Sequence, residues 1–130
     1  MFDWKKPTVQ MLGRWQPWHD GHQALFKRCV AKTGQVIVQV RDVQGTSGGD
    51  GQDDNPFNWD DVCKNIEEGL AKDGFHRGSE YEIMLVPNIV NITYGRGVGY
   101  SFEEESFDKS VTEISATKIR QKLREEGKLE

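Results

Sequence analysis

Three short apolar segments alternate with two helical patterns in this chain of 130 residues. The segments TVQMLG (8–13), QVIVQV (35–40) and YEIMLVPNI (81–89) have the length and the apolar content of buried strands. Strands that alternate with helices favour a parallel sheet joined by right-handed crossovers. Because QVIVQV is mostly apolar on both faces, we expect helices on both faces of that sheet. The pattern therefore predicts an α/β domain built on an open parallel sheet.

Two amphipathic helices are predicted between these strands. Residues 20–34 place their apolar side chains on one helical stripe, and Gly34 ends the pattern. Residues 55–74 form the second pattern, which either Asn55 or Asn58 caps at its start. Each helix therefore turns one apolar face toward the sheet.

The chain after the third apolar segment is less regular. Residues 91–107, NITYGRGVGYSFEEESF, alternate β-branched and aromatic residues with glycines, and they are too few for the helical crossover that another parallel strand needs. We therefore expect a hairpin-like or extended segment here. Residues 114–127 then form a helix with Ile119 and Leu123 turned inward. This abbreviated C-terminal part completes a single domain over residues 1–130.

The charge and hydropathy of the chain argue against two classes of partner. Lys and Arg number 17 against 21 Asp and Glu, so the net charge is -4 and the surface lacks the positive excess that a nucleic-acid backbone requires. No segment approaches the ~20 apolar residues that span a bilayer, and the start MFDWKKPTVQ has no apolar core of signal-peptide length. We expect a cytoplasmic protein with no nucleic-acid or membrane partner.

A cluster of rings and glycines follows the first strand, in MLGRWQPWHDGH (11–22). In an open parallel sheet, ligands bind beyond the carboxyl ends of the strands, where helix N-termini converge. Gly13 and Gly21 would let backbone approach a ligand, and free N–H groups at the helix start would favour an anion. His19 and His22 lie one turn apart and can aim both rings at one phosphate, with Arg14 as a further phosphate contact. This arrangement predicts a triphosphate site.

The motifs in which these residues stand resemble those of a known family. GRWQPWHDGH (13–22) looks like the GRFQPxHxGH signature of the nucleotidyltransferase superfamily, and ISATKIR (114–120) looks like its second signature, ISxTxIR. NPFNWDDV (55–62) is similar to the NPF segment that opens the second helix in archaeal-type nicotinamide-mononucleotide adenylyltransferases. Two ordered motifs at opposite ends of the chain are more specific than either alone.

The resemblance implies a Rossmann-like fold, with the chain as a single nucleotidyltransferase-like domain. It also implies a reaction in which a phosphate oxygen of an acceptor attacks the α-phosphorus of a nucleoside triphosphate and releases pyrophosphate, assisted by Mg²⁺. Such transfer needs positioning and charge stabilisation more than covalent help. The implied catalytic residues are His19, His22, Arg14 and Arg120. The implied nucleotide-binding residues are Gly13, Arg14, Gly21, His22, Ser115, Ala116, Thr117 and Arg120.

The acceptor side departs from the family pattern, because the region after the third strand is shorter than in those adenylyltransferases. Positions near the carboxyl edge of the sheet supply the candidate contacts for the acceptor: Trp18, Arg41, Asp42, Tyr94 and Arg96. Arg41 and Asp42 could also meet the metal, whose ligands the sequence leaves unknown. Trp15 and Trp18 are separated by Gln16 and Pro17, so we expect them to point in different directions, with Trp15 in the core.

Three functions are compatible with these motifs. The first is an adenylyltransferase that uses ATP and a small phosphorylated acceptor, with nicotinamide mononucleotide the best single candidate. The second is a compact cytidylyltransferase that uses CTP and a phosphorylated alcohol or sugar, although those short enzymes resemble GTFDxxHxGH instead. The third is a non-catalytic nucleotide-binding module, which need not keep groups aimed at a transition state. The short sheet edge also suggests an association partner, most simply another copy of the chain.

Overall fold

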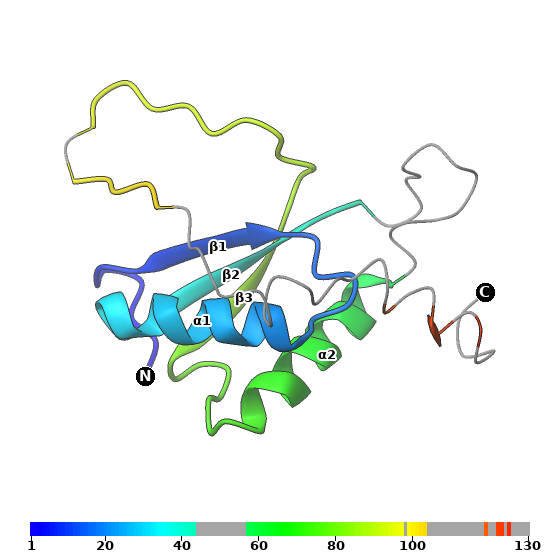
Figure 1. The fold of residues 1–130 in the computed structure, drawn as a ribbon. Helices are drawn as coiled ribbons and strands as arrows, with labels where there is room; N and C mark the ends of the chain where they lie inside the picture. Colours follow the sequence, from blue (N-terminus) through cyan, green and yellow to red (C-terminus); the bar gives the residue numbers. More distant parts are fainter. Residues whose placement is uncertain (44–56, 98, 104–118, 120–121, 124, 126–130) are drawn as a thin grey trace.

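The protein, as a computed structural model, is described over residues 1–43, 57–97, 99–103, 119, 122–123 and 125 (Figure 1). Its elements are β1 (Val9–Gly13), α1 (Asp20–Thr33), β2 (Val36–Arg41), α2 (Trp59–Ala71) and β3 (Tyr81–Val86). The three strands form one parallel sheet in the order β1-β2-β3. This arrangement confirms the α/β class and the Rossmann-like open parallel sheet.

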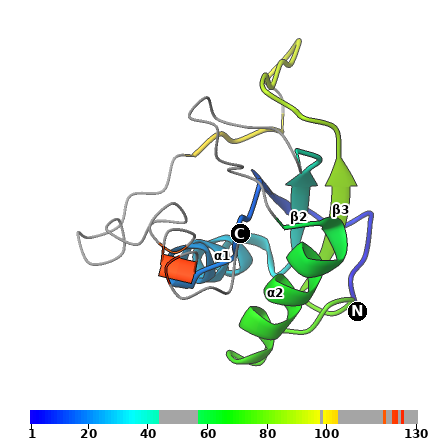
Figure 2. The same cartoon turned by 90° about the vertical axis from the view of Figure 1, so that its right-hand side faces the viewer.

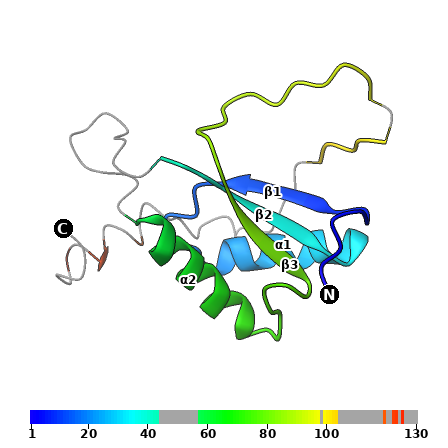
Figure 3. The same ribbon diagram turned by 180° about the vertical axis from the view of Figure 1, so that it is seen from behind.

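One face of the sheet carries the core. The register pairs Met11 with Val38 and Val38 with Ile83, so these three side chains form one row across the strands, and all three are buried. Phe26 of α1 and Ile66 of α2 belong to the same core cluster. Figures 1 and 3 show α1 on one side of the sheet, and Figure 2 shows α1 and α2 next to each other.

Of the helices expected on the two faces of the sheet, α1 and α2 share one face, and the third predicted helix lies largely outside the described residues. Both crossovers step in the same direction along the sheet, from β1 to β2 and from β2 to β3, so right-handed connections place α1 and α2 on the same face. The opposite face carries polar side chains among apolar ones, including the hydrogen-bonded pair Gln10 and Gln39. The apolar content of QVIVQV therefore reflects one fully buried face and one partly covered face.

The helix boundaries follow from local chemistry. Gly34 ends α1 in the left-handed conformation, with φ of 86°, and its N–H donates to the Val30 carbonyl. Asn58, rather than Asn55, caps α2, because its side chain accepts from the Asp61 N–H at 2.8 Å. Asn55 lies outside the described residues.

The chain after β3 is extended, and within residues 87–97 and 99–103 it adds no strand to the sheet. Its two arms meet through aromatic rings: Tyr94 stacks on Phe102 with ring centroids 4.8 Å apart. Glu103 forms an ion pair with Lys32 in the last turn of α1. The extended form of the segment was predicted, whereas its return toward the C-terminal end of α1 was not.

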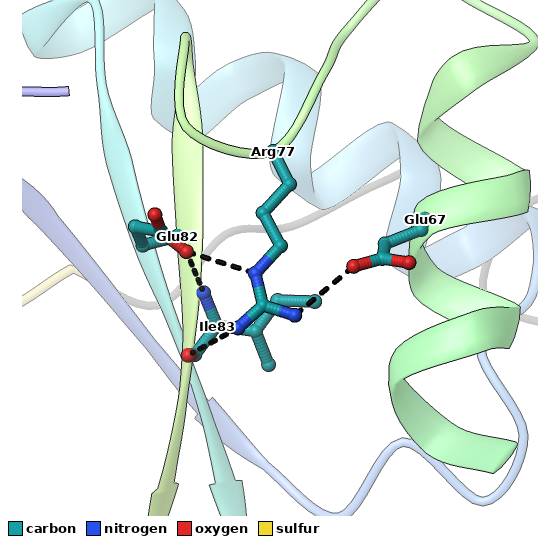
Figure 4. Close-up of polar contacts among 4 residues, drawn as sticks. All are labelled: Glu67, Arg77, Glu82 and Ile83. Atoms are coloured by element: carbon teal, nitrogen blue, oxygen red, sulfur yellow. Dashed lines mark hydrogen bonds and ion pairs between the residues drawn. The ribbon is translucent and has the colours of Figure 1, made fainter. Parts of the chain in front are cut away.

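The amino end of β3 is joined to α2 by one guanidinium (Figure 4). Arg77 donates from Nε to Glu82 at 2.8 Å and from Nη1 to Glu67 at 3.0 Å. The hydrogen bond to Glu82 raises the pKa of Arg77 above its ordinary value. This contact braces the end of the sheet opposite the carboxyl edge.

Candidate active site

Two histidines form the start of α1, and each caps the other. Nδ1 of His19 accepts from the N–H groups of Gly21 at 3.0 Å and His22 at 3.4 Å. Nδ1 of His22 accepts in return from the N–H of His19 at 3.2 Å. This is a capping box built from imidazoles in place of the usual Ser and Glu. Because each Nδ1 is an acceptor, the proton of each neutral ring sits on Nε2, which leaves two Nε2–H donors.

The helix cap changes which groups at the start of α1 can meet an anion. The sequence predicted free backbone N–H groups at the helix start, but those of Gly21 and His22 are bonded to the His19 ring, and that of Gln23 donates to the His19 carbonyl at 2.9 Å. An anion that approaches this helix end therefore meets imidazole N–H groups first. The site is made by side chains rather than by bare amides.

The two imidazoles are stacked and held among aromatic rings. Their centroids lie 3.6 Å apart with an interplanar angle of 16°. The centroid of the His22 ring also lies 4.8 Å from that of Trp15, in a T-shaped arrangement, and 5.5 Å from that of Trp18, with the two rings tilted by 47°. Burial lowers the pKa of His19, and burial together with the neighbouring His19 lowers that of His22 to about 3. Both rings are therefore neutral hydrogen-bond donors near pH 7.

The expectation that Trp15 and Trp18 point in different directions is wrong. Both rings are buried, with centroids 5.2 Å apart. Trp15 adopts a positive φ of 54°, which turns the chain so that both rings enter the same core. A Cβ on Gly13 would lie 2.8 Å from the Trp15 ring. The packing of Trp15 therefore requires a glycine at position 13.

Trp18, predicted as an acceptor contact, instead packs between the two helices. Its Nε1 donates to Gln23 Oε1 at 2.7 Å, and Gln23 Nε2 donates to the carbonyl of Gly69 at 2.7 Å. A Cβ on Gly69 would lie 2.8 Å from Trp18 Cδ1. The glycine in the last turn of α2 thus makes room for the indole, which in turn supports His22.

Gly69→Ala is expected to destabilise the protein by roughly 1–3 kcal/mol, because the new methyl group overlaps a packed indole. The change would otherwise be favourable, since alanine is preferred over glycine in a helix by ~1 kcal/mol. Denaturant unfolding measures the difference. Gly95→Ala is the matched control, because a Cβ at Gly95 meets nothing within 4 Å. A Gly69→Ala protein as stable as the wild type would contradict this packing.

Gln16 joins the histidine loop to the start of α2. It is 3% exposed, and its amide forms two hydrogen bonds with the backbone of Phe57: Nε2 to the carbonyl at 3.0 Å, and Oε1 from the N–H at 2.8 Å. Sequence reasoning singled out neither Gln16 nor Gln23. The only signal for Gln16 was its place inside the GRWQP motif, since its partner lies 41 residues away.

Three further candidate residues gather at the carboxyl edge of the sheet. Gly13 pairs with Val40, so Arg14 and Arg41 both follow that pair at neighbouring strand ends. Arg14 is half-buried. Arg41 donates from Nη2 to Asn88 Oδ1 at 2.7 Å. Asp42 is exposed beside it.

The structure does not bring Tyr94 and Arg96 to this edge. Tyr94 stacks on Phe102, next to Glu103, whose partner Lys32 lies at the opposite end of α1 from His19. That helix has 14 residues and is therefore about 20 Å long. In Figure 1 the chain after β3 runs back over the sheet. The remaining predicted residues, Ser115, Ala116, Thr117 and Arg120, lie outside the described residues.

The described part of the chain holds neither a metal-binding cluster nor a membrane-spanning helix. Among those residues, no group of three or more His, Cys, Asp or Glu side chains is placed to hold a metal ion. No helix there has both the length and the apolar character needed to cross a bilayer.

Comparison with known proteins gives one relevant similarity. A nicotinamide-nucleotide adenylyltransferase of Methanococcus aeolicus is 25% identical over an alignment of 133 positions, gaps included, that spans 87% of this chain and 75% of the relative. No protein-family model matches the chain. The similarity extends well beyond the histidine segment and supports a nucleotidyltransferase.

Proposed function

We propose that this protein transfers AMP from ATP to a small phosphorylated acceptor and releases pyrophosphate. Nicotinamide mononucleotide is the first acceptor to test, because the similar Methanococcus aeolicus protein is named as a nicotinamide-nucleotide adenylyltransferase. The observation that carries the proposal is the stacked pair His19 and His22, with both Nε2–H donors at the N-terminus of α1 beside the carboxyl end of β1. Ligands of open α/β sheets bind at that edge.

The chemistry asks little of the protein beyond position and charge. An oxygen of the acceptor phosphate forms a bond to the α-phosphorus of ATP, and the bond from that phosphorus to the bridging oxygen breaks, so pyrophosphate leaves with the electron pair. Charge builds on the phosphoryl oxygens during this exchange. Neutral imidazoles that donate from Nε2 stabilise that charge without giving up a proton. We assign this role to His19 and His22.

The remaining roles follow the resemblance. Arg14 at the end of β1 and Arg120 in the second motif would hold the β- and γ-phosphates as charge-assisted donors. Ser115, Ala116 and Thr117 would offer amide and hydroxyl donors to the same groups. Mg²⁺ would enter with the triphosphate, since it is commonly bound through substrate phosphates and few protein carboxylates. The proposal assigns Mg²⁺ no protein ligand.

The deciding experiment measures pyrophosphate release with Mg²⁺. ATP, CTP, GTP and UTP are each offered with a panel of phosphorylated acceptors that includes nicotinamide mononucleotide. We expect release only with ATP and one acceptor. Release with CTP instead would favour the cytidylyltransferase alternative. Binding of ATP with no release in any pairing would overturn the proposal in favour of a nucleotide-binding module.

A further inference from the structure

A cavity of about 400 Å³ opens at the carboxyl edge of the sheet, and neither His19 nor His22 is among its lining residues. It is lined by Leu12, Arg41 and residues 89–92. The register places Leu12 opposite Gln39, out of the row that contains Met11 and Val38, so the cavity lies on the face that α1 and α2 leave uncovered. Its volume falls in the usual range for small-molecule sites.

Arg41 is the charged group of this cavity, and its charge is not neutralised within the described residues. Nη2 donates to the amide oxygen of Asn88, a neutral acceptor. Nε is buried and has no hydrogen-bond partner. None of the described carboxylates forms an ion pair with this guanidinium. Three aliphatic side chains of the lining, those of Ile89, Val90 and Ile92, offer it no acceptor.

We propose that this cavity binds an anionic group, a carboxylate or a phosphate, carried on a small apolar body. A guanidinium with an unsatisfied donor beside apolar walls is completed by an oxygen anion, which forms a charge-assisted hydrogen bond. The apolar body would pack on Leu12 and the isoleucines. Asn88 holds the guanidinium in place through Nη2 and is a positioning residue.

The place of the cavity identifies the ligand as the acceptor, and this one step rests on the proposed function. Leu12 immediately precedes Gly13 and the histidine loop, so the cavity and the imidazole pair flank the same end of β1. Adenine is uncharged and would leave Arg41 without an anion. The acceptor would therefore carry a second negative group, apart from the phosphate that reacts. Nicotinamide mononucleotide has no such group, because its base is a cationic pyridinium, so turnover with it would contradict this assignment to the acceptor but not the binding of an anion in the cavity.

Fragment binding tests the cavity without requiring turnover. Benzoate and phenyl phosphate are titrated against benzamide, their neutral analogue, with the methyl NMR signals of Leu12, Ile89 and Ile92 as the readout. We expect at least one anion to shift these signals and to bind about tenfold more tightly than benzamide, as a charge-assisted bond predicts. Whichever anion binds more tightly identifies the group as a carboxylate or a phosphate.

Variants assign this preference to the guanidinium. Arg41→Leu should remove the advantage of the anions, and Asn88→Ala should reduce it severalfold. Arg28→Leu, which changes an exposed arginine on α1, is the matched control. Equal binding of benzamide and the anions, or an unchanged preference in a folded Arg41→Leu protein, would overturn the cavity proposal. Displacement of the fragment by ATP would overturn the assignment of the cavity to the acceptor. If the protein releases no pyrophosphate, the proposed function fails, but fragment binding in the cavity should persist.

Discussion

Replacing His19 with asparagine is expected to lower turnover roughly 10²–10³-fold, which is the usual cost of removing one transition-state donor. The free energy of unfolding should barely change. Asparagine places its side-chain oxygen near the position of Nδ1, and asparagine is among the best N-cap residues. The variant therefore keeps the acceptor for the N–H groups of Gly21 and His22 but loses the Nε2–H donor.

The opposite substitution separates the two roles of the same ring. His19→Gln places an amide N–H closer to the position of Nε2 and removes the cap, so it should retain more activity than His19→Asn while losing about 1 kcal/mol of stability. Initial rates of pyrophosphate release and denaturant unfolding measure the two effects. A His19→Asn protein with near wild-type rates would contradict the catalytic role. If His19→Asn and His19→Gln lose activity and stability to the same extent, the result would indicate that His19 acts only as the N-cap of α1.

The order of elements could be predicted because it depends on local periodicity. The apolar runs of β1 to β3 and the helical stripe with Phe26 and Cys29 are visible in any short window of sequence. The face of the sheet that α1 and α2 cover could not be predicted from local periodicity, because it depends on the order of the strands in the sheet. Both crossovers step in the same direction across the sheet, and the sequence of a single apolar strand does not indicate that direction.

The surroundings of the histidines could be predicted only in part, because the contacts that hold them are distant in sequence. The spacing of His19 and His22 predicted that the two rings lie together, and they form one stacked pair, whereas their shared phosphate target stays a prediction. The contact between Trp18 and Gly69 of α2 could not be predicted, because the two residues lie 51 positions apart in the sequence. A tryptophan beside a motif looks the same in sequence whether it lines a pocket or fills a core.

The stability of the protein is expected to fall steeply as the pH drops from 6.5 toward 3. The pKa of His22 is lowered from 6.5 to about 3 by burial and by the neighbouring His19. Between these values the unfolded chain binds a proton at His22 that the folded chain does not bind, so acid favours unfolding. Above pH 6.5 the titration of His22 does not reduce the free energy of unfolding. At pH 3 the free energy of unfolding lost through His22 approaches the order of 4 kcal/mol.

Carboxylates also titrate in this range, so the effect of His22 must be measured as a difference. The free energy of unfolding is followed against pH for the wild type and for His22→Gln, which does not titrate. The wild type should lose stability relative to His22→Gln by about 1.4 kcal/mol per pH unit within that window. His76→Gln is the control for loss of an exposed histidine. Parallel curves for wild type and His22→Gln would mean that the His22 ring accepts a proton in the folded state. That result would contradict the arrangement in which the two buried histidines cap each other, because a proton on Nδ1 of His22 breaks the hydrogen bond from the His19 N–H.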